Sequence, residues 1–209
     1  MTQCVGSVKG TAAFPAASGG VIPTPTLQFD AAWRRRTTVS ACSVAKVAHH
    51  LKAHYLHRRP GVVVLCLWMT CGPVDAGAIV FALPPRETHK RYGGLTWELA
   101  RLYLIDSIPN NAETWFIGFA IRYIRQRYTH VRYLVSYADP SVGHTGTIYR
   151  AANWLSDGRT DDERKSPRCD YLGSNGKRYS RRGHVPDDVT VKRVPRVSKF
   201  RFVYHLGDR

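Results

Sequence analysis

The sequence predicts a mixed α/β protein in which helices flank a central sheet, and two observations support this fold class. Continuous apolar and β-branched runs, typical of buried strands, alternate along the chain with segments whose apolar residues recur at helical spacing. The chain has 209 residues, 44% of them hydrophobic, so it can build one domain with a substantial core.

The elements are expected in a simple order. A helix capped by Ser43 should run to about Arg58 and stop before Pro60. Further along the chain we expect strands at 62–68, 77–83, 96–105 and 131–137, a long helix at 112–128, a short helix at 145–152, and last strands at 154–155 and 197–206. Residues 1–26 read as a poorly ordered N-terminal arm, and residues 27–209 as a single domain.

The charge balance indicates a polyanionic partner. The net charge is +16, and the segment from Arg164 to Arg209 holds 13 basic and four acidic residues, a net charge of +9. Such an excess favours nucleic acid over an anionic membrane, although charge that only maintains solubility is the alternative. Aromatic residues lie among these cations, which suits a surface that binds phosphates and stacks on bases. Within 164–201 we expect DNA contacts from six residues: Lys177, Arg178, Arg181, Arg182, Lys192 and Arg193.

The cysteines and the apolar runs exclude several classes of protein. The five cysteines form no Cys-x-x-Cys pair and are odd in number, which argues against a disulfide framework and a zinc ribbon. The longest apolar run, Val62–Met69, is too short to span a bilayer, and the N-terminus lacks a continuous apolar signal region. We therefore expect a reduced, cytoplasmic protein with no membrane partner.

Several motifs occur in a characteristic order: Trp97–Tyr103, Pro109–Asn111, Ser136–Pro140, Gly143–Tyr149 and Ala151–Trp154. With His54-Tyr55 upstream, this set resembles the Mom family of phage DNA-modification proteins over roughly residues 43–158. The resemblance implies an acetyltransferase-like (GNAT) fold. It also implies that double-stranded DNA is the partner and that its adenine is converted to N6-carbamoylmethyladenine, which protects phage DNA from host restriction.

The resemblance also implies site residues. The expected catalytic residues are Asp139, Tyr149, Tyr55, His54, Ser136 and Arg101. The expected substrate-binding residues are Asn110, Asn111, His144, Thr147, Asn153 and Trp154. Iron is a candidate cofactor, because the family has been associated with non-haem iron, and His54, Tyr55 and Asp139 are its candidate ligands.

Asp139 and Tyr149 each have a functional and a structural interpretation. Asp139 follows a strand end, where ligands bind in open α/β sheets, so it could act as general base toward the adenine amino group. Alternatively, it only satisfies the turn before Pro140. Tyr149 is a candidate general acid or a core residue. If residues 145–152 are helical, Thr145, Tyr149 and Asn153 share one face.

Two other sets of residues are open to more than one interpretation. His50, His54 and His57 would share a face of the first helix, as metal ligands or as a solvated stripe. Glu98 and Arg101 are three residues apart in one strand, which predicts opposite faces. A structural ion pair is the default interpretation, and Arg101 orienting the substrate is the alternative.

The donor of the transferred group is not identified by the sequence. Residues 105–112 occupy the place of the glycine-rich loop with which acetyltransferases bind coenzyme A, yet they lack glycine and carry Asp106 beside Glu113. Acetyl-CoA is therefore a doubtful donor. The alternatives to adenine modification are an acyl- or aminoacyl-transferase acting on another nucleic acid or a protein amine, and a non-catalytic basic DNA-binding module. A homodimer is one possible oligomeric state.

Overall fold

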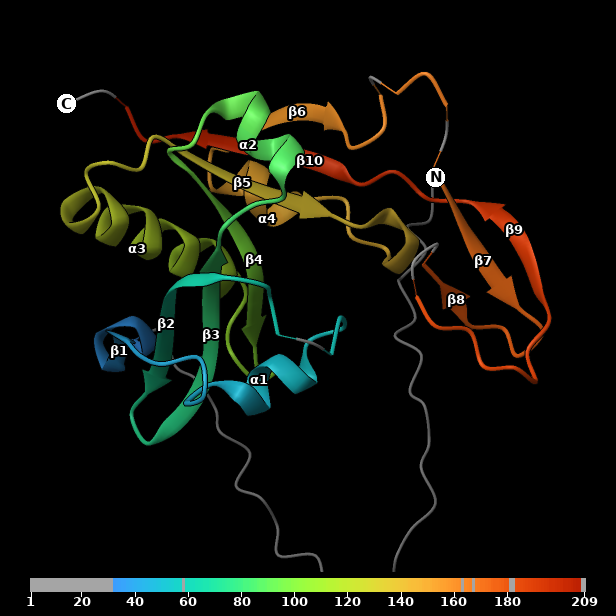
Figure 1. The fold of residues 1–209 in the computed structure, drawn as a ribbon. Helices are drawn as coiled ribbons and strands as arrows, with labels where there is room; N and C mark the ends of the chain where they lie inside the picture. The colour runs from blue at the N-terminus through green and yellow to red at the C-terminus, as the bar shows by residue number, and fades with distance from the viewer. Residues whose placement is uncertain (1–31, 58, 163, 167, 181–182, 208–209) are drawn as a thin grey trace, which may run out of the picture.

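The computed structural model describes residues 32–207, apart from residues 58, 163, 167, 181 and 182. The main body is a seven-stranded sheet in the order β1-β2-β3-β4-β5-β10-β6, with helices packed on it (Figure 1). Neighbouring strands are antiparallel except for β4 and β5, which are parallel. A separate three-stranded sheet, β8-β7-β9, lies beside this body (Figure 1). The expected mixed α/β class is confirmed.

The strands of the main sheet are β1 (Thr37–Ala41), β2 (Val63–Cys71), β3 (Val74–Ala82), β4 (Thr96–Leu104), β5 (Tyr133–Ala138), β6 (Leu155–Arg159) and β10 (Phe200–His205). The small sheet consists of β7 (Cys169–Gly173), β8 (Arg178–Tyr179) and β9 (Val191–Pro195). The α-helices are α1 (Ala48–Ala53), α2 (Arg86–Tyr92), α3 (Ala112–Arg127) and α4 (Thr147–Ala151), and the 3-10 helices are η1 (Trp33–Arg36) and η2 (Pro140–Val142). No helix in the described part of the chain is long and apolar enough to cross a membrane.

Elements with strong local patterns were predicted well. The strands expected at 62–68, 77–83, 96–105 and 131–137 correspond to β2, β3, β4 and β5, and the helix at 112–128 is α3. β1, α2 and the small sheet were not expected, and the arm expected at 1–26 lies outside the described residues. The missed elements are short and lack a period that could identify them from sequence.

The helix expected from Ser43 to Arg58 is much shorter in the structure. It spans Ala48–Ala53, Val47 is its N-cap residue, and His54 already has extended backbone at φ −64° and ψ 141°. The expected common face of His50, His54 and His57 is therefore wrong, because the chain leaves the helix between the first two histidines. This early exit turns His54 and Tyr55 toward the sheet.

Alternation along β2 separates two cores. Leu65, Leu67 and Met69 point to the face covered by α3 and belong to the larger cluster of buried residues. Cys66 lies on the other face, where it packs with Val47 and Leu51 from the α1 region. The sheet is therefore covered on both sides, which explains the continuous apolar sequence of its central strands.

A β-bulge in β4 determines which side chains reach the site. Along β3, Val80 pairs with Arg101 and its neighbour Phe81 pairs with Leu99, so Ala100 is an extra residue in β4. Bulges of this kind bend a strand and redirect side chains. β4 also pairs with β5 only through Thr96–Glu98, although both strands continue beyond that point.

Gly146 fixes the start of α4 against β10. Its φ is +81°, and a Cβ placed on it would lie 2.2 Å from two ring carbons of Phe202. Gly143, in the same loop, has φ +78°, but a Cβ there would meet no atom within 4 Å. Both glycines thus adopt the left-handed backbone region, but a side chain would clash with its surroundings only at Gly146.

We predict that Gly146→Ala lowers the free energy of unfolding more than Gly143→Ala does. Both variants should carry a cost for a left-handed alanine, while Gly146→Ala should lose about 1–3 kcal/mol more through overpacking against Phe202. Urea unfolding followed by circular dichroism measures the difference. Equal losses in the two variants would show that Phe202 does not constrain this loop.

Candidate functional site

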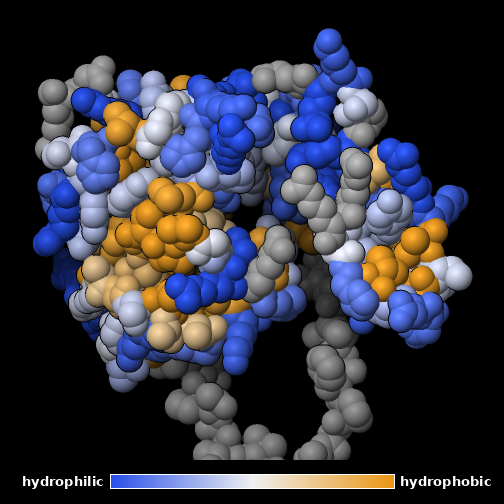
Figure 2. Space-filling view, in the orientation of Figure 1, coloured by the Kyte–Doolittle hydropathy of each residue, from blue (hydrophilic) through white to orange (hydrophobic). Residues whose placement is uncertain are grey.

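A pocket of about 560 Å³ opens where β4 and β5 separate. Its walls are formed by the last residue of α1 and residues 54–56 after it, 98–104 of β4, 136–138 of β5, the loop and helix at 143–149, and Asp106, Glu113 and Lys199. Figure 2 shows a hollow between the main body and the small sheet on this face of the molecule. The pocket itself is lined by no residue of the small sheet. Segments distant in sequence therefore meet around one cavity.

Many of the expected site residues line this pocket: His54, Tyr55, Arg101, Ser136, His144, Thr147 and Tyr149. Asp139 lies one residue beyond the end of β5, close to the pocket through its contact with Lys199. Asn110, Asn111, Asn153 and Trp154 are not among the lining residues. The structure thus brings most of the expected catalytic residues together, but only part of the expected substrate-binding set.

The residues outside the pocket have structural positions. Asn111 and Asn153 adopt positive φ, 69° and 61°, at the start of α3 and just after α4. Asparagine tolerates this backbone region better than most residues. Trp154 is buried and packs against Tyr149 and Tyr204. Because α4 spans only Thr147–Ala151, the expected helix face shared by Thr145, Tyr149 and Asn153 is wrong.

Ser136 and Tyr149 form a buried hydrogen-bond chain. Ser136 Oγ lies 2.9 Å from the Leu99 carbonyl oxygen and 2.8 Å from the Tyr149 hydroxyl. The carbonyl can only accept, so Ser136 donates its single proton to Leu99 and Tyr149 donates to Ser136. Burial raises the pKa of Tyr149 to about 12, so its phenol is neutral at physiological pH. This chain of hydrogen bonds connects β4, β5 and α4.

Glu98 and Arg101 both line the pocket, contrary to the expectation that they point to opposite faces. The bulge at Ala100 adds one residue between them and so cancels the simple alternation. Burial raises the pKa of Glu98, and the positive charges of Arg101 and Lys199 only partly offset it. Arg101 is itself buried. The pocket therefore holds a carboxylate whose proton affinity is raised.

Asp139 is held by two neighbours. Its carboxylate accepts from the backbone N–H of Ser141 at 3.0 Å and from the Ser141 hydroxyl at 2.5 Å, and it pairs with Lys199 Nζ at 2.9 Å. Burial would raise the pKa of Asp139, but these hydrogen bonds outweigh it and hold the pKa below its ordinary value. Asp139 is therefore a firmly ionised group that fixes Lys199, a pocket residue that no motif identified.

His54 and Tyr55 form the wall contributed by the α1 segment. Burial, together with the charge of Arg101, lowers the pKa of His54 to about 4, so its imidazole is neutral at physiological pH. Burial and the nearby charge of Asp139 raise the pKa of Tyr55. The Tyr55 ring meets the His144 ring edge-on, with centroids 5.0 Å apart. Two aromatic rings thus frame this side of the pocket.

The expected iron ligands do not fit a cation in this arrangement. His54 Nδ1 accepts the Leu56 backbone N–H at 3.2 Å, which leaves the proton of the neutral ring on Nε2. The Asp139 carboxylate is occupied by Lys199 and Ser141, and Arg101 adds positive charge beside His54. We therefore assign no catalytic step to a metal at these three residues.

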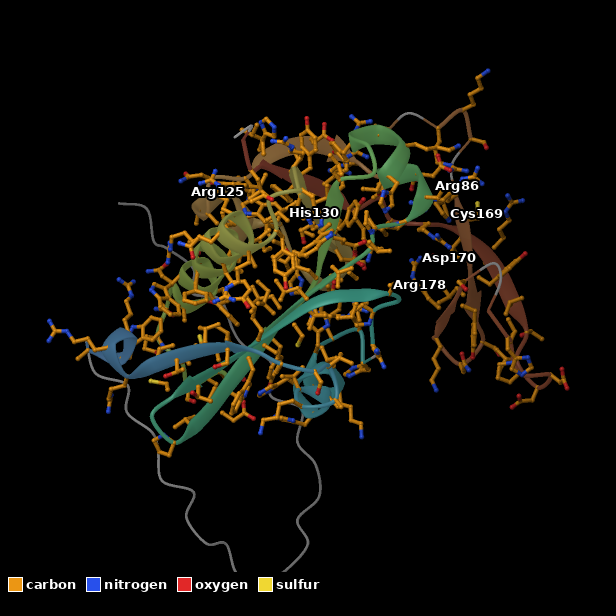
Figure 3. All side chains as sticks on the ribbon, turned by 60° about the vertical axis from the view of Figure 1, so that its left-hand side comes forward. Arg86, Arg125, His130, Cys169, Asp170 and Arg178 are labelled. Carbon is orange, nitrogen blue, oxygen red and sulfur yellow. The ribbon has the colours of Figure 1, made fainter. Side chains whose placement is uncertain are left out.

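The expected DNA-contacting residues are divided between the two faces of the small sheet. Leu172 of β7 pairs with Arg178 and Lys192, whereas Tyr171 pairs with Tyr179 and Arg193. Cross-strand partners share a face, and successive residues alternate. Figure 3 shows Arg178, Asp170 and Cys169 on this sheet, apart from Arg125 and His130 of the main body. Arg181 and Arg182 lie outside the described residues.

The cations of the small sheet are exposed. Lys177, Lys192 and Arg193 are exposed, and none of them pairs with an acidic side chain in the part of the chain that the structure describes. By contrast, Asp170 of β7 pairs with Arg196 just after β9, and Asp161 pairs with Arg168 just before β7. These two acidic residues thus neutralise structural arginines rather than the outer cations.

Several solved structures with the same overall fold are acetyltransferases. The ribosomal-protein-S5-alanine acetyltransferase of Vibrio fischeri matches with a TM-score of 0.52 and 8% identity, over 83% of this chain and 94% of that one. A Bacillus subtilis acetyltransferase in complex with CoA gives a TM-score of 0.50 and 11% identity, over 81% and 97%. At these identities the likeness establishes the acetyltransferase-like fold alone, which confirms the expected architecture.

The amino-acid sequence of this chain is similar to that of a phage Mu protein. The methylcarbamoylase Mom of Escherichia phage Mu is 39% identical over 57 residues, which are 27% of this chain and 24% of that protein. The match thus spans only about a quarter of the relative's length. The model of the Mom protein family matches a far longer segment, residues 37–209, which includes the whole pocket and the small sheet. The chain belongs to the Mom protein family.

Proposed function

We propose that this protein modifies adenine in duplex DNA, by transferring a carbamoylmethyl group to the N6 amino nitrogen. The observation that carries the proposal is membership of the Mom family over 37–209, whose phage Mu relative is named a methylcarbamoylase. The +16 net charge and the exposed cations of the small sheet support a DNA substrate. Protection of phage DNA from host restriction is the biological role that follows.

The pocket has the properties that a modified base requires. The N6 atom of a paired adenine is hard to reach inside the stack, so enzymes that alter bases flip them into a pocket. Tyr55 and His144 offer aromatic surfaces at one wall, and Arg101 and Lys199 are cations near the same opening. We propose that the flipped adenine enters here while Arg178 and Lys192, on one face of the small sheet, bind phosphates.

As the N6–carbon bond forms, the bond between the carbamoylmethyl carbon and the donor's leaving group breaks and its electron pair departs with the leaving group. The amino nitrogen loses one proton, and we propose that a pocket residue accepts it. Asp139 was the expected base, but its lowered pKa makes it a weak proton acceptor. Glu98 lines the pocket and has a raised pKa, so we propose Glu98 as general base. In this proposal Asp139 positions Lys199, and the Tyr149–Ser136 chain holds the strands in place.

The donor is proposed to differ from acetyl-CoA. Asp106 and Glu113 both line the pocket beside the start of α3, the end of a helix that would otherwise attract a pyrophosphate. Their negative charges oppose such binding. A donor without a diphosphate group at this position is therefore favoured.

Mass spectrometry of nucleosides tests the proposed function directly. DNA from cells that express the protein should contain an adenosine species heavier by the carbamoylmethyl group, and DNA from cells with the Glu98→Gln variant should contain little of it. Unmodified adenine together with an acylated protein or RNA would identify the alternative transferase. Tight DNA binding without any modification would identify a binding module.

We predict that Glu98→Gln lowers the modification rate by about 100-fold or more, the usual contribution of a positioned base. The pKa of Glu98 lies above the ordinary value of about 4.3. In the unchanged protein the modification rate should therefore fall as the pH drops through this raised pKa, because a protonated Glu98 can no longer accept the proton from adenine. Glu87→Gln, at an exposed glutamate of α2, is the matched control and should keep the full rate. Asp139→Asn should lose less, because an amide still accepts from Lys199 and Ser141. A larger loss in Asp139→Asn than in Glu98→Gln would return the role of base to Asp139.

We predict that one face of the small sheet binds DNA. The double variant Arg178→Ala with Lys192→Ala should weaken binding and reduce the slope of log K against log salt by about 0.9 for each phosphate that is no longer bound. Arg193→Ala, on the opposite face, is the control and should leave the slope unchanged. Fluorescence anisotropy with duplex DNA at several salt concentrations measures both. A slope that changes only in Arg193→Ala would assign the interface to the other face.

A further inference from the structure

A second cluster of ligand-type side chains lies away from the pocket. His49 and His50 in the first turn of α1 both reach Asp75 at the start of β3. The His49 Nε2 lies 2.8 Å from one carboxylate oxygen and the His50 Nε2 lies 2.6 Å from the other. All three ligand atoms lie within 4.8 Å of one another. Nothing in the proposed transfer reaction uses these residues.

We propose that His49, His50 and Asp75 form a binding site for a divalent transition-metal ion such as Zn²⁺, Fe²⁺ or Co²⁺. Two imidazoles and one carboxylate, with positions left open for water, are a donor set that suits these ions. Mg²⁺ and Ca²⁺ prefer shells made of oxygen and are not favoured here. This proposal does not depend on the proposed DNA modification.

The side chains must move apart to accept an ion. Ligand bonds to Zn²⁺ are about 2.1 Å long, so ligand atoms around one tetrahedral ion are about 3.4 Å apart. The observed separations of 2.6 and 2.8 Å, each between an imidazole nitrogen and a different oxygen of Asp75, are shorter, and side-chain rotations would open them. The side chains of His49 and Asp75 are 58% and 37% exposed, while that of His50 is only 4% exposed. The site therefore has one fixed wall and one side open to solvent.

An outer residue holds the carboxylate in place. The Trp68 indole N–H, from β2, donates to an Asp75 oxygen at 2.6 Å. Hydrogen bonds of this kind orient metal-ligating carboxylates. Asp75 itself is positioned by an irregularity of the β2–β3 hairpin, where Met69 pairs with Gly77 and Thr70 pairs with Asp75. The carboxylate is thus aimed at α1 by both its backbone and its partner.

A metal at this site would fasten α1 to the sheet behind the catalytic pocket. α1 leads directly into His54 and Tyr55, which line the pocket. The His50 ring also packs against Tyr103 of β4, with centroids 5.4 Å apart, and Tyr103 is itself a lining residue. The ion would therefore stabilise the pocket wall without meeting the substrate.

The experiment uses the full chain without a histidine tag, freed of metal by a chelator and then dialysed. Isothermal titration with Zn²⁺ and the visible absorption of Co²⁺ should both report one bound ion, and the ion should raise the melting temperature. His49→Ala, at an exposed position, and Asp75→Asn, which keeps an acceptor for Trp68, should each weaken binding by at least about 100-fold. Trp68→Phe should weaken it by about 10-fold, as expected for an outer-shell partner.

Two controls separate this site from other histidines. His184→Ala, at an exposed residue, and His54→Ala, at the pocket, should both bind the ion as the unchanged protein does. The proposal is overturned if the folded protein binds neither Zn²⁺ nor Co²⁺. It is equally overturned if His49→Ala and Asp75→Asn bind normally, or if His54→Ala alone removes the ion. If the folded protein binds neither ion, the cluster is only a hydrogen-bonded link between α1 and the β2–β3 hairpin.

Discussion

The backbone ladder between the parallel strands β4 and β5 ends after Glu98 and Val135, and beyond that point the Ser136 hydroxyl links the strands by donating to the Leu99 carbonyl. Tyr149 completes this link from α4. If the ladder continued, backbone would close the space that the pocket occupies. The separation of two paired strands is thus the constraint on which the site depends, and one buried hydrogen-bond chain maintains it.

The charges around the pocket follow from this opening. The bulge at Ala100 directs Glu98 and Arg101 into the same cavity, and Lys199 enters from the segment before β10. Burial acts on the two carboxylates differently, because Asp139 has hydrogen-bond donors of its own, whereas nearby charges alone offset the burial of Glu98. Two acidic groups with opposite shifts in pKa can perform different tasks in one site, one fixing a cation and the other accepting a proton.

The α1 segment joins two candidate sites with different chemistry. Its first turn presents His49 and His50 to the hairpin, and the chain that leaves it presents His54 and Tyr55 to the pocket. The cationic surroundings of Asp139 disfavour an ion in the pocket, whereas the Asp75 cluster combines imidazoles with a carboxylate. The proposed metal site and the wall of the pocket are therefore connected through one short helix and the residues that follow it.

The sequence by itself determined the central strands, the long helix α3 and the mixed α/β class, since apolar runs and helical periodicity are local properties of the chain. Its ordered motifs also identified most of the pocket, including His54, Arg101 and Ser136. Only the tertiary structure decided that Glu98 shares the face of Arg101, because a bulge cancels alternation, and that α1 ends before His54. It alone brought Lys199 to Asp139 and Asp75 to His49, pairs that are far apart in sequence and that no local pattern connects.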